Sequence, residues 1–346
     1  MTVDASNALL RWYDSRKRAL PWRAEPDEKP DPYRVWLSEI MLQQTTVAAV
    51  RPYFESFVRR WPTVADLAAA DEAEIMAAWA GLGYYARARN LVACAREVAE
   101  RGAFPDDEDG LRALPGIGRY TAAAIAAIAF GRRAVPVDAN VERVVARYFA
   151  ISTPLPAGRA EIHEAAERLF PADRCGDMAQ ALMDLGSAIC TARSPQCAAC
   201  PLADGCAAVG QGEPQAFPVK APKPARPRRR GFAYWVEHDG DVLLVRRPNS
   251  GMLGGMLALP TGAWSESAEP GEGAPVPADW TDAGSVRHIF THFALDIRLL
   301  CAQVPARGTG NIWWPAHRLE EAGLPTLFSK LARCGLAWRE GAYERA

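Results

Sequence analysis

Residues Leu111–Gly131 read LRALPGIGRYTAAAIAAIAFG, a proline–glycine turn followed by an alanine-rich run of helical character. Pro115, Gly116 and Gly118 separate two helical stretches, and the second stretch begins just after the turn. Glycines there bring bare backbone N–H groups to the start of a helix, and such a nest binds a phosphate without reading sequence. Taken alone, the turn is equally consistent with a plain helix connector.

Two carboxylates in the N-terminal part of the chain suggest acid–base chemistry. In VPVDANVERV, residues 135–144, Asp138 precedes a helical stretch that begins near Ala139. Asp is a favoured N-cap, and a capping carboxylate stays ionised. Glu39 in VWLSEIMLQQTTV has apolar neighbours, so it lies either on an exposed face or in a site where burial keeps it protonated. One neutral and one charged carboxylate are typical of a site that cleaves glycosidic bonds.

Four of the eight cysteines are clustered with the spacing C-x6-C-x2-C-x5-C: Cys190, Cys197, Cys200 and Cys206. Sets of four thiolates hold structural zinc or an iron–sulfur cluster. Zinc ribbons usually combine two C-x2-C knuckles, and this loop has one, so the spacing favours a 4Fe–4S cluster over zinc. Four unrelated cysteines or disulfides are the third interpretation, and a reducing cytosol disfavours it.

Length and composition predict two domains in an ordinary globular protein. The chain has 346 residues, 49% of them hydrophobic, and a net charge of −1, which neither supports nor excludes nucleic-acid binding. No apolar run reaches the ~18–20 residues that span a bilayer, and the N-terminal segment lacks the order of a secretory signal. We expect a cytoplasmic, nucleoid-associated protein without membrane contacts.

The pattern changes from helical to strand-like along the chain. Residues 1–213 contain alanine-rich amphipathic stretches, residues 214–230 form a Pro/Arg-rich linker, and residues 231–346 alternate as strands do. FAYWVEH and DVLLVRR flank a hairpin signal, and SVRHIFTHFALDIRLL continues the alternation. Four of these stretches are predicted to be helices: Glu72–Trp79, Ala86–Glu100, Thr121–Phe130 and Ala160–Leu169.

Five ordered motifs together resemble the endonuclease III superfamily of helix-hairpin-helix DNA glycosylases, and within it the MutY-type adenine DNA glycosylases. They are WLSEIMLQQTTV, GLGYYARARN, LPGIGRYTAAAIAAIAFG, VDANVERV and the cysteine loop, which extend from about Pro21 to Cys206, with a weaker match over 231–346. The resemblance implies a mainly α catalytic part, with a six-helix barrel and an iron–sulfur helical subdomain, followed by an α+β Nudix-like domain. It also implies excision of adenine mispaired with 8-oxoguanine or guanine in base excision repair.

The resemblance assigns the chemistry to named residues. Glu39 falls on the general acid that protonates adenine at N7, and Asp138 on the carboxylate that stabilises the sugar cation or adds to it transiently. Tyr120 and Asn140 match positions that support this pair. Bifunctional relatives carry a lysine where this chain has Tyr120, so the resemblance implies base removal without efficient strand cleavage.

DNA contacts follow from the same comparison, because the target base must leave the stack and the gap must be filled. One group of positions matches the family's two wedges and its hairpin: Gln43, Gln44, Thr45, Leu82, Tyr84, Gly116 and Gly118. Of the neighbours Tyr84 and Tyr85, we expect one to be a core residue.

The lesion sensor of the C-terminal domain matches Phe290, Thr291 and His292, with threonine where serine is typical. A core or surface role is the alternative for His292. The segment TGAWSESAEPGEG lacks the Arg/Glu-rich run with which a hydrolytic Nudix domain holds magnesium, so pyrophosphatase activity is not expected.

Two other functions stay open. One is a glycosylase of the same superfamily that acts on thymine or uracil opposite guanine, although pyrimidine excision needs no N7 protonation. The other is a non-catalytic lesion-binding protein that recruits repair proteins through the basic linker. The expected partner is double-stranded DNA with A:8-oxoguanine or A:G mispairs, bound by a monomer that also contacts repair proteins through the linker.

Overall fold

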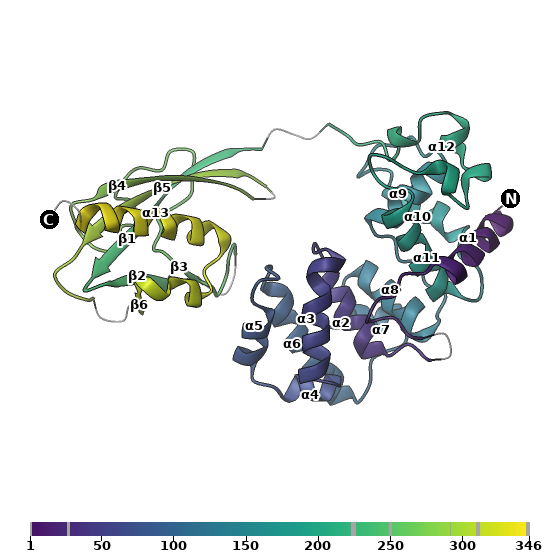
Figure 1. The fold of residues 1–346 in the computed structure, drawn as a ribbon, viewed down its shortest axis with the longest axis horizontal. Coiled ribbons are helices and arrows are strands. Elements are labelled where there is room, and N and C mark those ends of the chain that lie inside the picture. The colour runs from purple at the N-terminus through teal and green to yellow at the C-terminus, as the bar shows by residue number, and fades with distance from the viewer. Residues whose placement is uncertain are drawn as a thin grey trace. The chain divides into compact units, whose positions relative to one another are not determined.

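The computed structural model describes residues 2–25, 28–222, 226–248, 251–290, 292–308 and 312–343. The chain forms two compact units, Met1–Pro222 and Lys223–Ala346. The first unit consists mainly of helices, and the second is built on a mixed β-sheet (Figure 1).

Short helices with well-defined caps make up the first half of the helical unit. Asp31 accepts from the N–H of Tyr33 at the start of α2, where Pro32 occupies the first turn, and Thr63 and Asp66 form a capping box on α4. The helices are α1 (Thr2–Arg16), α2 (Pro32–Leu42), α3 (Val47–Arg60), α4 (Val64–Ala69), α5 (Glu72–Trp79), α6 (Ala86–Arg101), α7 (Glu108–Arg112) and α8 (Arg119–Phe130).

The second half of this unit packs against the N-terminal helix, since α11 contacts α1. Its elements are α9 (Ala139–Tyr148), α10 (Arg159–Glu167), α11 (Cys175–Ala188), α12 (Ala207–Gly210) and the short 3-10 turns Cys197–Ala199, Ala203–Gly205 and Pro214–Ala216. The four helices named from the sequence are present as α5, α6, α8 and α10, and their bounds differ from the predicted ones by at most two residues.

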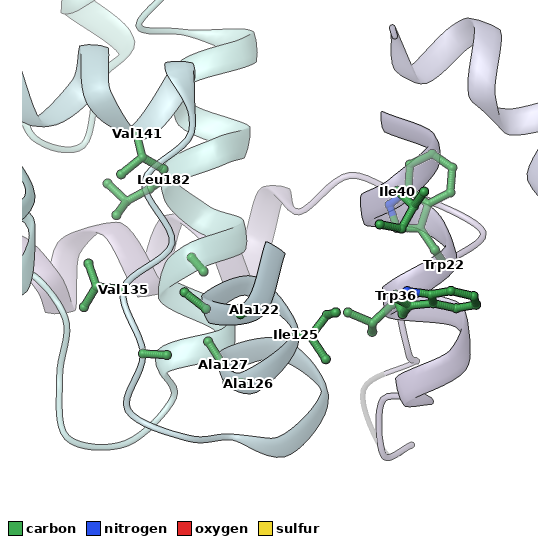
Figure 2. Close-up of a cluster of buried hydrophobic side chains, with 14 of the residues drawn as sticks. Trp22, Trp36, Ile40, Ala122, Ile125, Ala126, Ala127, Val135, Val141 and Leu182 are labelled. Carbon is green, nitrogen blue, oxygen red and sulfur yellow. The ribbon is translucent and has the colours of Figure 1, made fainter. Parts of the chain in front are cut away.

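Helix α8 lies at the centre of the helical unit. Figure 2 shows Ala122, Ile125 and Ala126 of α8 between Trp36 of α2 on one side and Leu182 of α11 on the other. Alanine side chains allow this close approach from both sides, and the helix positions Tyr120, in its first turn, against its neighbours. A Cβ at Gly176 of α11 would lie 2.6 Å from the carbonyl oxygen of Ala127, so that glycine permits the contact.

The segment between the two units is shorter than the expected linker 214–230. Phe217 is buried in the helical core and its carbonyl accepts from Nε of Arg147, while strand β1 already begins at Arg228. Residues 214–222 therefore belong to the helical unit and residues 228–230 to the sheet. Residues 223–225 lie outside the described residues.

The sheet of the second unit has the order β3–β2–β1–β5–β4, with β6 also paired to β2. Strands β1 and β5 run parallel, and the other pairs are antiparallel. Asp239 (φ 47°) and Gly240 (φ 82°) form the two-residue hairpin between β1 and β2 that the sequence predicted. The strands are β1 (Arg228–His238), β2 (Asp241–Arg246), β3 (Leu257–Ala258), β4 (Thr281–Ile289), β5 (Ala294–Gln303) and β6 (Ile312–Pro315).

Helix α13 (Thr326–Tyr343), which follows a 3-10 stretch at Ala316–Ala322, packs on this sheet. A Cβ at Gly335 would come within 2.2 Å of the Trp235 ring, so the glycine allows the helix to lie directly over the indole. Residues 259–280 between β3 and β4 are all described and contain no helix. A hydrolytic Nudix domain would carry its magnesium-binding helix in this region.

Candidate active site

Asp138 is the N-cap of α9, as the sequence predicted. Its Oδ1 accepts from the backbone N–H groups of Asn140 (2.9 Å) and Val141 (2.7 Å), and its Oδ2 accepts from Nδ2 of Asn140 (2.8 Å). Three N–H donors and the positive end of a helix all favour a negative carboxylate. The carboxylate is half-buried at the edge of a groove of about 990 Å³ that Tyr120 and Arg119 also line.

Glu39 lies on α2 and is only 8% exposed. Burial raises its pKa from 4.5 to about 7; a hydrogen bond with the Tyr120 side chain acts in the opposite direction, and the negative charge of Asp138 adds to the rise. The exposed-face alternative for Glu39 is therefore wrong. Burial thus disfavours the charged form of Glu39, and Tyr120 lies within interaction range of both Glu39 and Asp138.

Tyr120 itself is strongly held in its neutral form. Burial, the charges of Glu39 and Asp138, and the hydrogen bond with Glu39 all raise its pKa well above 10. Its Oη also lies 3.9 Å from Sδ of Met183 on α11. The tyrosine is therefore a neutral hydrogen-bond partner of the Glu39 carboxyl.

A buried ion cluster beside Glu39 was not found by sequence reasoning. Asp184 of α11 is 1% exposed and accepts from Nη1 and Nη2 of Arg23, both at 2.8 Å, and from Nε of Arg18 at 2.6 Å. Burial alone would raise the pKa of Asp184, but the two arginines outweigh it and the pKa lies below its usual value. Arg23 also acts on Glu39 through its charge. The partners are more than 160 residues apart in sequence, so no local pattern could join them.

Two further arginines connect Asp138 to the cysteine loop. Nη2 of Arg143 donates to Oδ1 of Asn140 (2.9 Å) and to the Gly186 carbonyl (2.6 Å), and its Nε donates to the Cys190 carbonyl (2.7 Å). Arg147, one turn later on α9, is 2% exposed and its Nη1 lies 3.3 Å from Sγ of Cys190. The first turns of α9 are therefore tied to the start of the loop.

The four clustered cysteines line one small apolar cavity between the loop and the ends of α9 and α11. Burial raises the pKa of the Cys200 thiol to about 11, and the neighbouring cysteines add to this, so that thiol stays protonated without a compensating positive charge. No three His, Cys, Asp or Glu side chains within the described part of the chain are close enough to hold a single metal ion. Four thiols around a shared cavity are the ligand set of structural zinc or of an iron–sulfur cluster.

The proposed wedge residues form two loops of different exposure. Gln44 (φ 57°) and Tyr84 (φ 50°) adopt left-handed backbone conformations at the tips, and Tyr84 is 60% exposed. Tyr85 packs partly buried on the core, which settles which of the two tyrosines is the core residue. Leu82, in contrast, is 7% exposed, so its side chain is part of the core here and not of the surface.

Three other residues expected to contact DNA are Gln43 and the hairpin glycines Gly116 and Gly118. Nε2 of Gln43 lies 3.4 Å from Oγ1 of Thr121 on α8. In the hairpin, Gly116 has φ 75° and a Cβ there would meet the Asn90 side chain at 2.7 Å, so only glycine fits. Gly118 caps α8 without a side chain, which leaves the helix N–H groups open.

In the second unit, Phe290 is a half-buried anchor and His292 is exposed. The Phe290 ring stacks on Trp264 (5.7 Å between centroids) and contacts Phe293 (5.0 Å), and its N–H donates to the Phe293 carbonyl to close the turn. His292 points its side chain into solvent in this turn, which excludes the core alternative for it. Thr291 lies outside the described residues.

Comparison with known proteins identifies the family. The HhH-GPD superfamily of base excision DNA repair proteins matches residues 37–172, the iron–sulfur binding domain of endonuclease III matches residues 190–206, and the NUDIX domain matches residues 231–333. An adenine DNA glycosylase of Rattus norvegicus is 35% identical over 96% of this chain and 78% of its own length. The chain belongs to the adenine DNA glycosylase family. A relative of the same name from Buchnera aphidicola is 29% identical over 94% of this chain and 96% of its own length.

Two solved structures of DNA glycosylases resemble part of this chain in fold. A thermostable thymine-DNA glycosylase is 30% identical with a TM-score of 0.54, covering 61% of this chain and 97% of its own. A trapped endonuclease III–DNA intermediate, 24% identical with a TM-score of 0.50 over the same share of this chain, shares the fold. The protein is a DNA N-glycosylase, a hydrolase of base excision repair, and its cysteine loop carries a 4Fe–4S cluster. Each helix within the described ranges is too short or too polar to cross a bilayer.

Proposed function

We propose that this enzyme excises adenine from A:8-oxoguanine and A:G mispairs in duplex DNA, as a monomer in the cytoplasm at the nucleoid. One observation carries the proposal: Glu39 is buried with a pKa of about 7, within electrostatic range of the hydrogen-bonded carboxylate of Asp138. An acid that is still protonated at neutral pH is what the departure of adenine requires.

In the proposed reaction Glu39 transfers its proton to N7 of adenine while the bond between C1′ and N9 breaks. The bond's electron pair goes to N9, so the base leaves neutral, and the sugar becomes an oxocarbenium ion. Asp138 stabilises that cation or adds to C1′ transiently. Water then attacks C1′ and gives its proton to the Glu39 carboxylate, which restores the acid. Acid–base and electrostatic assistance of this kind is worth about 10²–10⁴ in rate for each group.

Tyr120 and Asn140 would support this pair without covalent chemistry. Tyr120 holds the Glu39 carboxyl by a hydrogen bond, and Asn140 donates to both oxygens of Asp138. A tyrosine of raised pKa supplies no amine at C1′, so the product is an intact abasic strand.

The DNA contacts that we propose come from residues of each unit, taken separately. The bare N–H groups before α8, at Gly116 and Gly118, would bind phosphate, and the loops 43–45 and 82–84 would fill the gap left by the extruded base. Phe290 would anchor a turn from which Thr291 and His292 read 8-oxoguanine. Repair proteins would contact the basic residues between the units.

We further propose Cys190, Cys197, Cys200 and Cys206 as the ligands of the cluster, because they line a common cavity. When bound, the group would join the four thiolates at one centre and so hold the loop closed. Arg143 and Arg147 transmit the position of this loop to α9 through their hydrogen bonds.

Single-turnover incubation with three duplexes tests the proposal: adenine opposite 8-oxoguanine, adenine opposite guanine, and thymine opposite guanine. We expect excision of adenine with 8-oxoguanine as the preferred partner, abasic strands that break only with alkali, and no borohydride trapping. Excision of thymine from the third duplex would favour the alternative that the similarity to a thymine-DNA glycosylase keeps open. Binding without any excision would leave only a lesion-binding function.

A further inference from the structure

Arg87 occupies the space between the two exposed loops of the helical unit. It lies in the first turn of α6, is 9% exposed, and its guanidinium reaches backbone oxygens on both sides. Nη1 donates to the carbonyls of Ile40 (3.1 Å), Met41 (2.9 Å) and Gln43 (2.5 Å). These carbonyls belong to the last turn of α2, where helix carbonyl groups have no partner within the helix.

The other nitrogen of the same guanidinium binds the second loop. Nη2 donates to the carbonyls of Leu82 (3.1 Å) and Gly83 (3.3 Å) and also to Oγ1 of Thr45 (3.1 Å). The positive charge further lies 5.4 Å from the centroid of the exposed Tyr84 ring. The Arg87 side chain therefore contacts both loops, and its guanidinium also packs against the exposed ring of Tyr84.

Neighbouring contacts hold the second loop independently of Arg87. Oη of Tyr53 donates to the Ala80 carbonyl (2.8 Å), and Nε1 of Trp79 donates to the Gly83 carbonyl (3.1 Å). Within the described residues, the hydrogen bonds of Arg87 join loop 43–45 directly to loop 82–84. Loss of this side chain should therefore uncouple the loops without unfolding either one.

Burying a cation is costly, and burial lowers the pKa of Arg87. The cost is offset because the planar guanidinium presents several donors to carbonyls at the negative end of α2. Lysine would keep the charge but could not reach both loops with a fixed fork. The site therefore requires the geometry of arginine and not only its charge.

We propose that Arg87 is a positioning residue for base extrusion, which joins loop 43–45 and loop 82–84 so that they enter the duplex as one rigid wedge. The proposal rests on the proposed glycosylase function. Arg87 touches neither Glu39 nor Asp138 in any described contact, so it acts on the step that delivers adenine to the site and not on cleavage of the glycosidic bond.

The test compares Arg87→Lys with Arg96→Met in the full-length, cluster-containing protein. Arg96 is a matched control because it lies on the same helix in an exposed ion pair with Glu72. Extrusion is followed by the fluorescence of 2-aminopurine next to the target adenine, and cleavage by single-turnover excision. Two A:8-oxoguanine duplexes are used, one fully paired around the target and one with mismatched flanking pairs, in which the adenine is already unstacked.

For Arg87→Lys we expect extrusion and excision on the paired duplex to fall at least about tenfold, the loss typical when hydrogen bonds of a charged group are removed. The ratio of variant to wild-type rates should return close to one on the mismatched duplex. The pH dependence of excision should also flatten, because extrusion rather than proton transfer becomes limiting. Arg96→Met should match wild type throughout.

Equal loss on both duplexes, or wild-type extrusion by Arg87→Lys, would overturn the inference. Should this variant fail to fold, Thr45→Val removes one acceptor of Nη2 without leaving a buried charge unpaired, and the same pattern at a smaller amplitude is required of it. A wild-type protein that excises no adenine would refute the proposed function instead. Wild-type excision with an unaffected Arg87→Lys refutes only the role of Arg87.

Discussion

Asn140 donates to both oxygens of the Asp138 carboxylate, to Oδ1 through its backbone N–H at 2.9 Å and to Oδ2 through its side-chain amide at 2.8 Å. The backbone bond is part of the helix cap and survives any substitution, whereas the amide bond depends on asparagine. The amide oxygen also accepts from Arg143, so its orientation is fixed. The two contributions can therefore be separated by mutation.

Asn140→Ala should lower single-turnover adenine excision by about ten- to a hundredfold, because it removes a charge-assisted hydrogen bond worth roughly 1.5–3 kcal/mol. The melting temperature should change little, since the cap is retained. Glu142→Gln is the control, because it alters the same first turn without removing a donor to Asp138. An Asn140→Ala variant with the wild-type rate would show that the amide does not matter for catalysis.

Glu39→Gln should abolish excision while leaving binding to lesion duplexes nearly intact, because the amide fits the pocket but delivers no proton. In the wild type, the rate should fall as pH rises through about 7, since burial raises the pKa of the acid to that value and only its protonated form is active. The measurement is a single-turnover pH profile. A rate that stays constant to pH 9 would contradict the role of Glu39 as acid.

The same substitution should stabilise the fold at alkaline pH. The pKa of Glu39 is about 7 in the folded state against 4.5 as its ordinary value, so the folded protein loses stability as pH rises from 4.5 to 7. The full loss is at most roughly 3 kcal/mol, at ~1.36 kcal/mol per pKa unit. Glu39→Gln stays neutral, so at pH 8 it should unfold at higher denaturant concentration than wild type, with no gain at pH 4.5. An equal shift at both pH values would point to packing instead of charge.

Cys200→Ser should reduce iron content and broad absorbance near ~410 nm, which a cubane cluster held by four thiolates would give. It should also lower excision, because Arg143 and Arg147 hold the start of α9 against the loop. Cys334→Ser in the second unit is the control and should keep about four irons per chain. Colourless wild-type protein with one zinc would refute the cluster ligands proposed here.

Truncation after Pro222 should separate chemistry from lesion preference. The helical unit keeps its own core, and the carbonyl of Val219 still accepts from the N–H of Leu155. Residues 1–222 should excise adenine, but the preference for 8-oxoguanine over guanine should fall about tenfold or more, as expected for lost polar contacts of ~1–3 kcal/mol each. His292→Ala, which alters an exposed side chain, should reproduce part of this loss in the full chain. Unchanged preference in both would move lesion reading to the helical unit.

The elements of this fold were largely predictable from sequence, because local signals define them. The cap at Asp138, the glycine hairpin and the Asp239–Gly240 turn all follow from short-range chemistry. The parallel pairing of β1 with β5 was not predictable, since a long stretch of chain separates the two strands.

The state of Glu39 required the tertiary structure. Its neighbours Trp36, Leu37, Ile40 and Met41 are all buried, so α2 is enclosed on every side and carries the acid inward with them. Sequence could not distinguish this from an amphipathic surface helix. Likewise Arg87 resembles an ordinary helix-surface charge, and only the fold brings the loop carbonyls to it.

The ion cluster of Arg18, Arg23 and Asp184 has two cations and one anion, and this imbalance has a consequence for the proposed reaction. Arg23 of this cluster acts on Glu39 through its charge, in the direction opposite to that of Asp138. When Glu39 gives its proton to the departing base, it becomes an anion at the moment the sugar becomes a cation. The two new charges cancel, so the buried site would pass through cleavage with no change in its total charge and would need no counter-ion from solvent.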